Sequence, residues 1–384
     1  MPEFYLAWRY LNFHRLQTAV LVTVLAIIMA VPALLNTVLQ ATESQLTERA
    51  DATPLLVGAR GSRLDLAMSS LYFSDDRPEP ISMATSEAIW DSGLAIAIPL
   101  YNRFRVQSDP VIGTTLDYFR FRNLSVDQGR PLTVLGDAVV GARVAERRGL
   151  QPGDTLITSP DNLFDLAGSY PLRLNVSGIL APADSADDDA IFVDVKTTWV
   201  IEGIGHGHDD AELDDSGQMN ARIEQFREIT DANRDTFHFH GDPETYPITG
   251  VIAVPHDERS LTLLRGRYLD TEQAEQAVVP STVIRALLDQ LLTIKRLVDA
   301  IVLIILVATL VSVSLAIGLT LKLRQKELHT LYKLGARRSL TARLVFAETI
   351  IVLIISASIA TLLTIALNPV ATNLATRLLV GGAA

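Results

Sequence analysis

The sequence contains no cysteine among its 384 residues, which excludes disulfide bonds, thiolate metal sites and a cysteine nucleophile. It also lacks the GxxxxGK(S/T) loop that holds ATP phosphates, the GxSxG turn of serine hydrolases and the HExxH motif of zinc peptidases. Its acidic run at 187–189 is expected to form a solvated turn. These absences predict that the chain is not an enzyme.

Three long segments lack Asp, Glu, Lys and Arg: 16–42, 300–321 and 349–376. A helix needs roughly 20 mostly apolar residues to cross the hydrocarbon core of a bilayer, so each segment is predicted to span a membrane. The first is longer than the apolar region of a secretion signal and has no clean cleavage site, so we interpret it as a retained anchor.

Basic residues predict how these spans are oriented. The segment 322–348 contains seven Lys and Arg residues against two acidic residues, and the flank before the first span also carries arginines. Because short basic loops stay in the cytoplasm, the N-terminus and 322–348 are predicted to be cytoplasmic, and 43–299 is predicted to lie outside.

The two sides of this topology carry opposite charge. Residues 43–299 contain 23 basic and 41 acidic residues, while the rest of the chain contains 10 basic and 3 acidic residues, giving a net charge of −11. An acidic external domain is typical of soluble bacterial domains and argues against nucleic-acid binding.

The external segment 43–280 is predicted to form a mixed α/β domain with two lobes. Its residues 202–235 are polar and acidic, and are interpreted as a mobile insertion. The β-rich runs lie at 55–61, 104–107, 172–180 and 190–195, and helical spacing lies at 65–73, 87–98 and 141–150.

One long helix is predicted from Pro280 to about Leu334, because no other proline and only Gly318 interrupts the pattern. Such a rod could transmit a push across a membrane. Apolar residues along it follow alternating spacings of four and three, which suits either packing inside the membrane or a seam with a second copy. They are Leu287, Leu291, Ile294, Val298, Ile301 and Ile305.

Four stretches resemble the FtsX-like permease family of the MacB and LolC type. They are RQKELHTLYKLGARR at 324–338, GDAVVGARVAERRGLQPGDTL at 136–156, LRLNVSGILAP at 172–182 and DDAIFVDVKTTW at 188–199. The resemblance implies a helical membrane protein with a large mixed α/β periplasmic domain inserted between spans 1 and 2. This family usually has four spans and the chain offers three, since Asn368 and Pro369 are expected to break the last helix.

The expected order combines the spans with this resemblance. Residues 1–42 hold the cytoplasmic N-terminus and span 1, and 43–280 form the MacB-like periplasmic domain. A stalk and span 2 follow at 281–321. The cytoplasmic coupling loop is 322–348, span 3 is 349–376, and 377–384 form a periplasmic tail.

The resemblance implies a transport permease of the bacterial inner membrane that works by mechanotransmission. A separate ABC ATPase subunit would bind ATP and Mg, a second permease copy would complete a homodimer, and a periplasmic protein or lipoprotein would be a partner. The alternative is a signalling platform that controls a cell-wall hydrolase without transport. The implied ATPase contacts are Arg324, Glu327, Leu328, Leu331, Leu334, Gly335 and Arg337.

The amphipathic pattern of the coupling segment agrees with docking into a groove of a partner, since Leu328, Leu331 and Leu334 recur on one side of a helix while Lys326 and Lys333 lie away from them. Taken alone, the same pattern also suits a helix lying on anionic lipid.

Histidines form two H-x-H pairs, His206 with His208 and His238 with His240. In a strand, residues i and i+2 face the same way, so His238 and His240 would share one face. With His206, His208 and Asp209 or Asp210 from a flexible loop, they could supply a zinc site. The alternative is a solvated loop plus unrelated strand histidines. The chain also resembles a branch of the family associated with zinc-responsive transport, whose external loops tend to be His-rich; zinc as cargo, regulator or bystander stays open.

Overall fold

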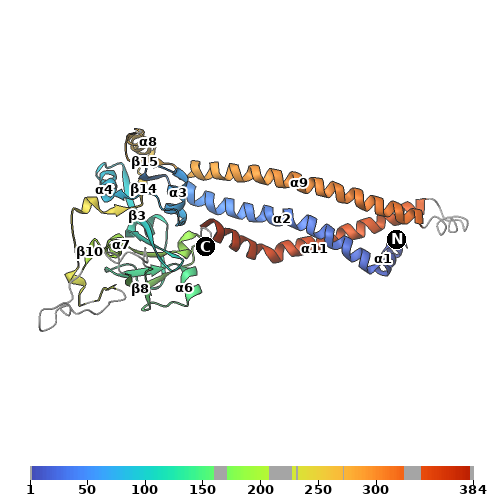
Figure 1. The fold of residues 1–384 in the computed structure, drawn as a ribbon, viewed down its shortest axis with the longest axis horizontal. Helices are drawn as coiled ribbons and strands as arrows, with labels where there is room; N and C mark the ends of the chain where they lie inside the picture. Colours follow the sequence, from blue (N-terminus) through green and yellow to red (C-terminus); the bar gives the residue numbers. More distant parts are fainter. Residues whose placement is uncertain are drawn as a thin grey trace, which may run out of the picture. The chain divides into compact units, whose positions relative to one another are not determined.

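The computed structural model describes residues 2–159, 171–206, 227–230, 232–270, 272–323 and 339–380. The chain divides into two compact units (Figure 1). One consists of Met1–Ser44 and Leu287–Thr376, and the other of Gln45–Ala286 with Arg377–Ala384. The first is helical, and the second contains the sheets.

Four long or terminal helices supply the helical unit. They are α1 (Pro2–Phe13), α2 (Arg15–Asp51), α9 (Pro280–Leu323) and α11 (Ser339–Val380). Val22 and Leu25 of α2 pack against Val352 of α11 in a small buried cluster. Helices α2 and α9 each contribute residues to both units.

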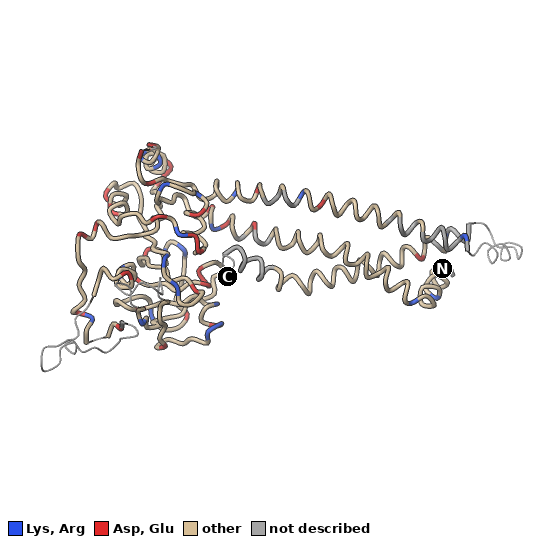
Figure 2. Tube along the Cα trace, viewed as in Figure 1, with Lys and Arg blue, Asp and Glu red and all other residues tan. Residues whose placement is uncertain are grey.

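Among the described residues, two helical segments are long and apolar enough to cross a membrane: Arg15–Gln40 and Phe346–Ala371. Figure 2 shows how few charged positions they carry compared with the α/β unit. Two of the three predicted spans therefore have matching helices. The third, 300–321, is helical within α9 but is not one of these two, so this span stays a prediction.

The last helix corrects one expectation. Asn368 and Pro369 do not break it, because α11 continues to Val380 with Pro369 inside. A proline removes one backbone hydrogen bond, but in an apolar segment the neighbouring backbone groups gain most from bonding within the helix. The predicted tail at 377–384 therefore begins inside a helix.

The α/β unit is built on a sheet of 11 described strands (Figure 1). Two strands, β5 (Val126–Gly129) and β7 (Thr155–Ile157), pair with β8 beside the main path. The order along that path is β11 (Arg227–Glu228), β8 (Leu172–Leu180), β6 (Asp137–Val140), β9 (Ile191–Asp194), β4 (Asp109–Thr114), β3 (Ala95–Val106), β14 (Gly250–Pro255), β1 (Leu55–Ala59) and β15 (Glu275–Val278).

The long strand β3 connects the two halves of this sheet. Its first half, from Ala95 to Leu100, pairs with β14, and its second half, from Tyr101 onward, pairs with β4. Two small sheets lie apart from the main one: β10 (Gly205–His206) with β12 (His238–Phe239), and β13 (Pro247–Ile248) with β2 (Ile81–Ser82).

Short helices connect the strands, and apolar side chains from strands and helices pack together in a large buried cluster. Asp194 caps the start of α7 by accepting a hydrogen bond from the Lys196 amide, and Gly203 ends that helix at a positive φ of 88°. The core includes Val57, Tyr101 and Trp199. The helices are α3 (Arg63–Tyr72), α4 (Met83–Asp91), α5 (Leu116–Phe121), α6 (Ala142–Arg148), α7 (Val195–Glu202) and α8 (Glu258–Arg267).

Most predicted elements of the domain are present, with one correction. The strand predicted at 172–180 is β8, but the helix predicted at 87–98 ends at Asp91, and β3 starts at Ala95. A turn at Gly93, with a φ of 65°, separates them, and the apolar stretch after it alternates as a strand does. The predicted insertion at 202–235 is described only at its ends, where Gly205–His206 and Arg227–Glu228 form strands.

Candidate functional site

Both long helices enter the α/β unit at neighbouring strands. Strand β1 follows the end of α2 closely, and β15 ends just before α9 begins. The two strands are antiparallel, with Leu56 opposite Val278. The ends of α2 and α9 are therefore tied together by backbone hydrogen bonds between their adjoining strands. We call this region, where residues 46–53 and 280–285 meet the sheet, the helix junction.

A buried arginine fastens α2 at the helix junction. Arg49, in the last turn of α2, donates from Nη1 to Asp187 Oδ2 at 2.6 Å and from Nη2 to Asp187 Oδ1 at 2.9 Å. Its Nη2 also donates to the Tyr118 hydroxyl at 2.8 Å, and its Nε donates to the Leu71 carbonyl. This two-pronged pairing matches the planar guanidinium to the carboxylate and sets the orientation of both groups.

Asp187 belongs to the acidic run that was expected to be a solvated turn, and that expectation is wrong. Asp187 and Asp188 are each only 1% exposed. The run forms a 3-10 turn, η1 (Ala186–Asp189), in which the Ser185 hydroxyl donates to Asp187 at 3.0 Å. Arg143 pairs with Asp188 at 3.1 Å. The buried Arg49 and the partly exposed Arg143 therefore pair with these buried carboxylates.

The charges at the helix junction stabilise one another. Burial alone would raise the pKa of Asp187, but the positive charge of Arg49, with hydrogen bonds from Arg49 and Tyr118, lowers it to about 2. Burial would lower the pKa of Arg49, and the nearby Asp187 carboxylate outweighs that effect and raises it. Burial raises the pKa of Tyr118. The pair therefore stays ionised at neutral pH.

Further contacts surround this pair. The Tyr72 hydroxyl donates to the Leu46 carbonyl in α2, and Arg122 donates to the Thr53 hydroxyl at 2.8 Å. Arg285, in the first turns of α9, contacts Asp51 at 3.1 Å in an exposed ion pair. The last turns of α2 are thus held from several sides of the domain.

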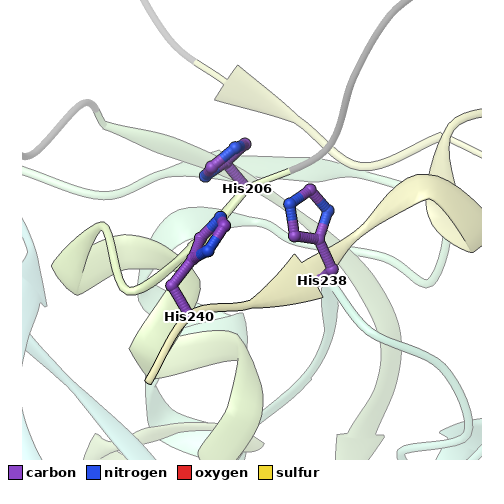
Figure 3. A group of neighbouring side chains, drawn as sticks. All are labelled: His206, His238 and His240. Atoms are coloured by element: carbon purple, nitrogen blue, oxygen red, sulfur yellow. The ribbon is translucent and has the colours of Figure 1, made fainter.

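A second group of polar side chains lies on the small β10–β12 sheet. His206 stands opposite His238 across the two strands, and His240 follows on the same side as His238 (Figure 3). The ring centres of His206 lie 4.7 Å from those of His238 and 4.8 Å from those of His240. The ligating atoms of all three lie within 4.8 Å of one another.

The structure thus brings three of the four predicted metal ligands together, while His208 lies outside the described residues. The seam residues all lie on α9, where Ile301 and Ile305 are exposed within this single chain. The predicted ATPase contacts all fall in 324–338, outside the described residues: Arg324, Glu327, Leu328, Leu331, Leu334, Gly335 and Arg337.

Sequence reasoning missed Arg49, because its partner Asp187 lies 138 residues away and no local spacing connects them. One signal was available. An arginine in the last turn of a long helix, close to the start of a domain, needs a carboxylate partner if it is buried.

Comparison with known proteins decides the family. Residues 18–225, more than half of the chain, match the MacB-like periplasmic core domain. The chain belongs to the MacB/FtsX-type ABC permease family. MacB-like permeases pair with ABC ATPases and lack catalytic activity themselves.

Two solved structures are similar to this MacB-like chain. The periplasmic region of MacB from Actinobacillus actinomycetemcomitans has 12% sequence identity and a TM-score of 0.36, covering 63% of this chain and 97% of that one. A domain of a protein named as a permease from Porphyromonas gingivalis has 12% identity and a TM-score of 0.27, covering 59% and 86%. No curated protein matches the chain. None of these comparisons supports membership of a zinc-associated branch.

The buried ion pair predicts that replacing Arg49 destabilises the protein much more than replacing Arg285, which also lies at the helix junction. Replacing Arg49 with Met leaves the Asp187 carboxylate buried without its counter-ion, and should cost about 3–5 kcal/mol of unfolding free energy. The matched change Arg285→Met removes an exposed pair and should cost at most about 1 kcal/mol. Denaturant unfolding of the full-length protein in detergent, followed by tryptophan fluorescence, measures both. Equal losses would contradict a special role for Arg49.

The lowered pKa of Asp187 predicts a specific acid sensitivity. Its folded-state pKa of about 2 lies below the ordinary value of 3.8, so its contribution to stability is complete above about pH 4 and is lost as the pH falls toward 2. Asp187→Asn should be less stable at neutral pH and should lose less stability across that window. The control Asp117→Asn, which removes an exposed i,i+3 pair with Arg120, should keep the wild-type slope. Unfolding midpoints measured from pH 5 to pH 2 test this, and identical slopes for both variants would refute it.

Proposed function

We propose that the chain couples ATP hydrolysis in a separate ABC ATPase subunit to motion of its own periplasmic α/β domain. The observation that supports this proposal best is the helix junction, where the Arg49–Asp187 pair and the β1–β15 pairing fix two long helices to one sheet. A domain that receives force through helices needs such rigid attachments.

The length of α9 suits force transmission. Its 44 residues run from Pro280 to Leu323 without a described break. At 1.5 Å per residue it extends about 66 Å, about twice the roughly 30 Å hydrocarbon thickness of a bilayer. One helix of this length can reach from a cytoplasmic contact to the domain.

The segment 324–338 is the proposed contact with the ATPase. It follows α9 directly in sequence, and the spacing of Leu328, Leu331 and Leu334 would place them on one side of a helix, with Arg324, Glu327, Gly335 and Arg337 as further proposed contacts. In this account, ATP and Mg bind only to the partner subunit. Closure of the ATPases moves this segment, and α9 carries the motion to the domain.

The exposed face of α9 supports a second copy as the dimer partner. Ile301 is 56% exposed and Ile305 is 45% exposed in the single chain. The predicted seam that contains them could pack against the same seam of a second chain. The complex would lie in the bacterial inner membrane.

The absence of charged side chains from the predicted spans supports an action outside the bilayer. A polar route across a membrane usually carries ionisable groups, and 16–42, 300–321 and 349–376 contain none. The moving domain would therefore act on a periplasmic protein, lipoprotein or substrate. A link with zinc homeostasis would enter this function only through the histidines of the β10–β12 sheet.

Alanine substitutions within 324–338 test the coupling proposal. Leu331→Ala truncates the apolar side and should weaken association with the ABC ATPase by about 30-fold, which corresponds to a loss of about 2 kcal/mol at an interface anchor. Lys333→Ala, which the sequence spacing would place on the other side of such a helix, is the matched control and should have little effect. Co-purification and ATPase activity of the reconstituted complex measure both.

The opposite pattern would contradict the proposal. If Lys333→Ala impaired function while Leu331→Ala did not, the segment would be better described as a helix held on anionic lipid by its positive charge.

A further inference from the structure

We propose that His206, His238 and His240 form a binding site for a divalent transition metal of the zinc class. The site goes beyond the coupling function and does not depend on it. Three imidazoles from two paired strands converge on one point, with their ligating atoms within 4.8 Å of one another (Figure 3). An alternating strand pattern alone would not bring the third ring, from the other strand, to the same point.

One hydrogen bond orients His238 for metal binding. Its Nδ1 lies 3.1 Å from the Thr236 carbonyl oxygen. A carbonyl oxygen can only accept, so Nδ1 carries the proton and donates it, and in the neutral ring Nε2 carries the lone pair. Metal-binding histidines usually donate their second ring nitrogen to a carbonyl or carboxylate in this way, which fixes the ring and raises its basicity.

Aromatic packing beneath the histidines holds the two strands in register. Phe239 turns to the opposite side of β12, where its ring centre lies 6.3 Å from Trp199 and 6.2 Å from Tyr246. A side chain at Gly205 would come within 2.6 Å of the Phe239 ring, so only glycine permits this close approach. The anchored phenylalanine therefore directs the neighbouring histidines to the other side.

Backbone contacts fix the third histidine. The His240 amide donates to the Ile204 carbonyl at 3.2 Å, and the Tyr246 hydroxyl donates to the His240 carbonyl at 3.2 Å. Tyr246 in turn stacks edge-on against Trp199 at 4.9 Å. The scaffold under the cluster is thus part of the domain core.

The donor set selects the class of metal. Three neutral imidazoles suit Zn²⁺, Cu²⁺ or Ni²⁺, whereas Ca²⁺ and Mg²⁺ prefer oxygen ligands. Tetrahedral zinc with bonds of 2.0–2.1 Å separates its ligand nitrogens by about 3.3 Å. Small rotations of the rings would bring the histidine nitrogens to that separation. His206 and His238 are half-buried and His240 is exposed, which leaves them room to turn. Three protein ligands leave a fourth position for water or another ligand.

A bound ion would join chain segments that are far apart in sequence. It would link β10 to β12 and so hold together the two positions that flank residues 207–237. Since binding only the folded protein stabilises it, zinc should raise the unfolding temperature of the wild-type protein.

The test uses the full-length protein in detergent, cleared of metal with a chelator. Titration calorimetry with Zn²⁺ should give one ion per chain, and Co²⁺ should develop the visible absorption of a tetrahedral site. Each of His206→Ala, His238→Ala and His240→Ala should weaken binding by more than about 100-fold, because losing a ligand costs more than losing a supporting contact. His256→Ala, which changes an exposed histidine outside the cluster, should bind as the wild type does.

Three results would refute the proposed site: no saturable zinc binding, a zinc affinity unchanged in the three variants, or an equal loss of zinc affinity in His256→Ala. If a variant fails to fold, the wild type is tested instead. It is treated with diethyl pyrocarbonate with and without zinc, and mass spectrometry measures which histidines are modified. Zinc should then protect the three histidines and leave His256 reactive, and equal reactivity would refute the proposal. No ATPase is present in either assay, so failure here leaves the coupling proposal intact.

Discussion

The ion pair between Arg49 and Asp187 is the contact on which the helix junction depends. Both groups are buried, and each would be costly to bury alone, so each requires the other. Together they fix the end of α2, from which β1 continues into the sheet. Because β1 pairs with β15, and α9 follows β15, the end of α2 and the start of α9 are joined at this region.

The acidic domain uses its charge for structure as well as for solubility. Arg147 and Arg148 both pair with Asp109, which is 3% exposed, and Arg143 pairs with Asp188. These pairs join helix α6 to the sheet and to the acidic turn that receives Arg49. A domain held by such directional pairs suits the transmission of force, since guanidinium and carboxylate groups keep a set geometry.

How much could be predicted from the sequence depended on how local each signal was. Strand β8 and helix α6 follow their hydrophobic patterns, and the alternation of His238 and His240 placed both on one face. Partners from distant segments could not be predicted. The pairing of β10 with β12, which adds His206 to the cluster, and the burial of Asp187 against Arg49 are set by the tertiary fold, and local spacing does not encode them.

If the helix junction carries ATPase-driven motion into the periplasmic domain, that motion should depend on Arg49. The chain has no cysteine, so a single spin label at Glu146→Cys, an exposed position on α6, would report the distance between the domains of the two copies in the proposed dimer. Pulsed electron paramagnetic resonance of the complex with its ATPase should show a distance change with ATP that Arg49→Met abolishes while ATP is still hydrolysed. An unchanged distance in the wild type, or the same change in a folded Arg49→Met protein, would show that the helix junction does not carry this motion.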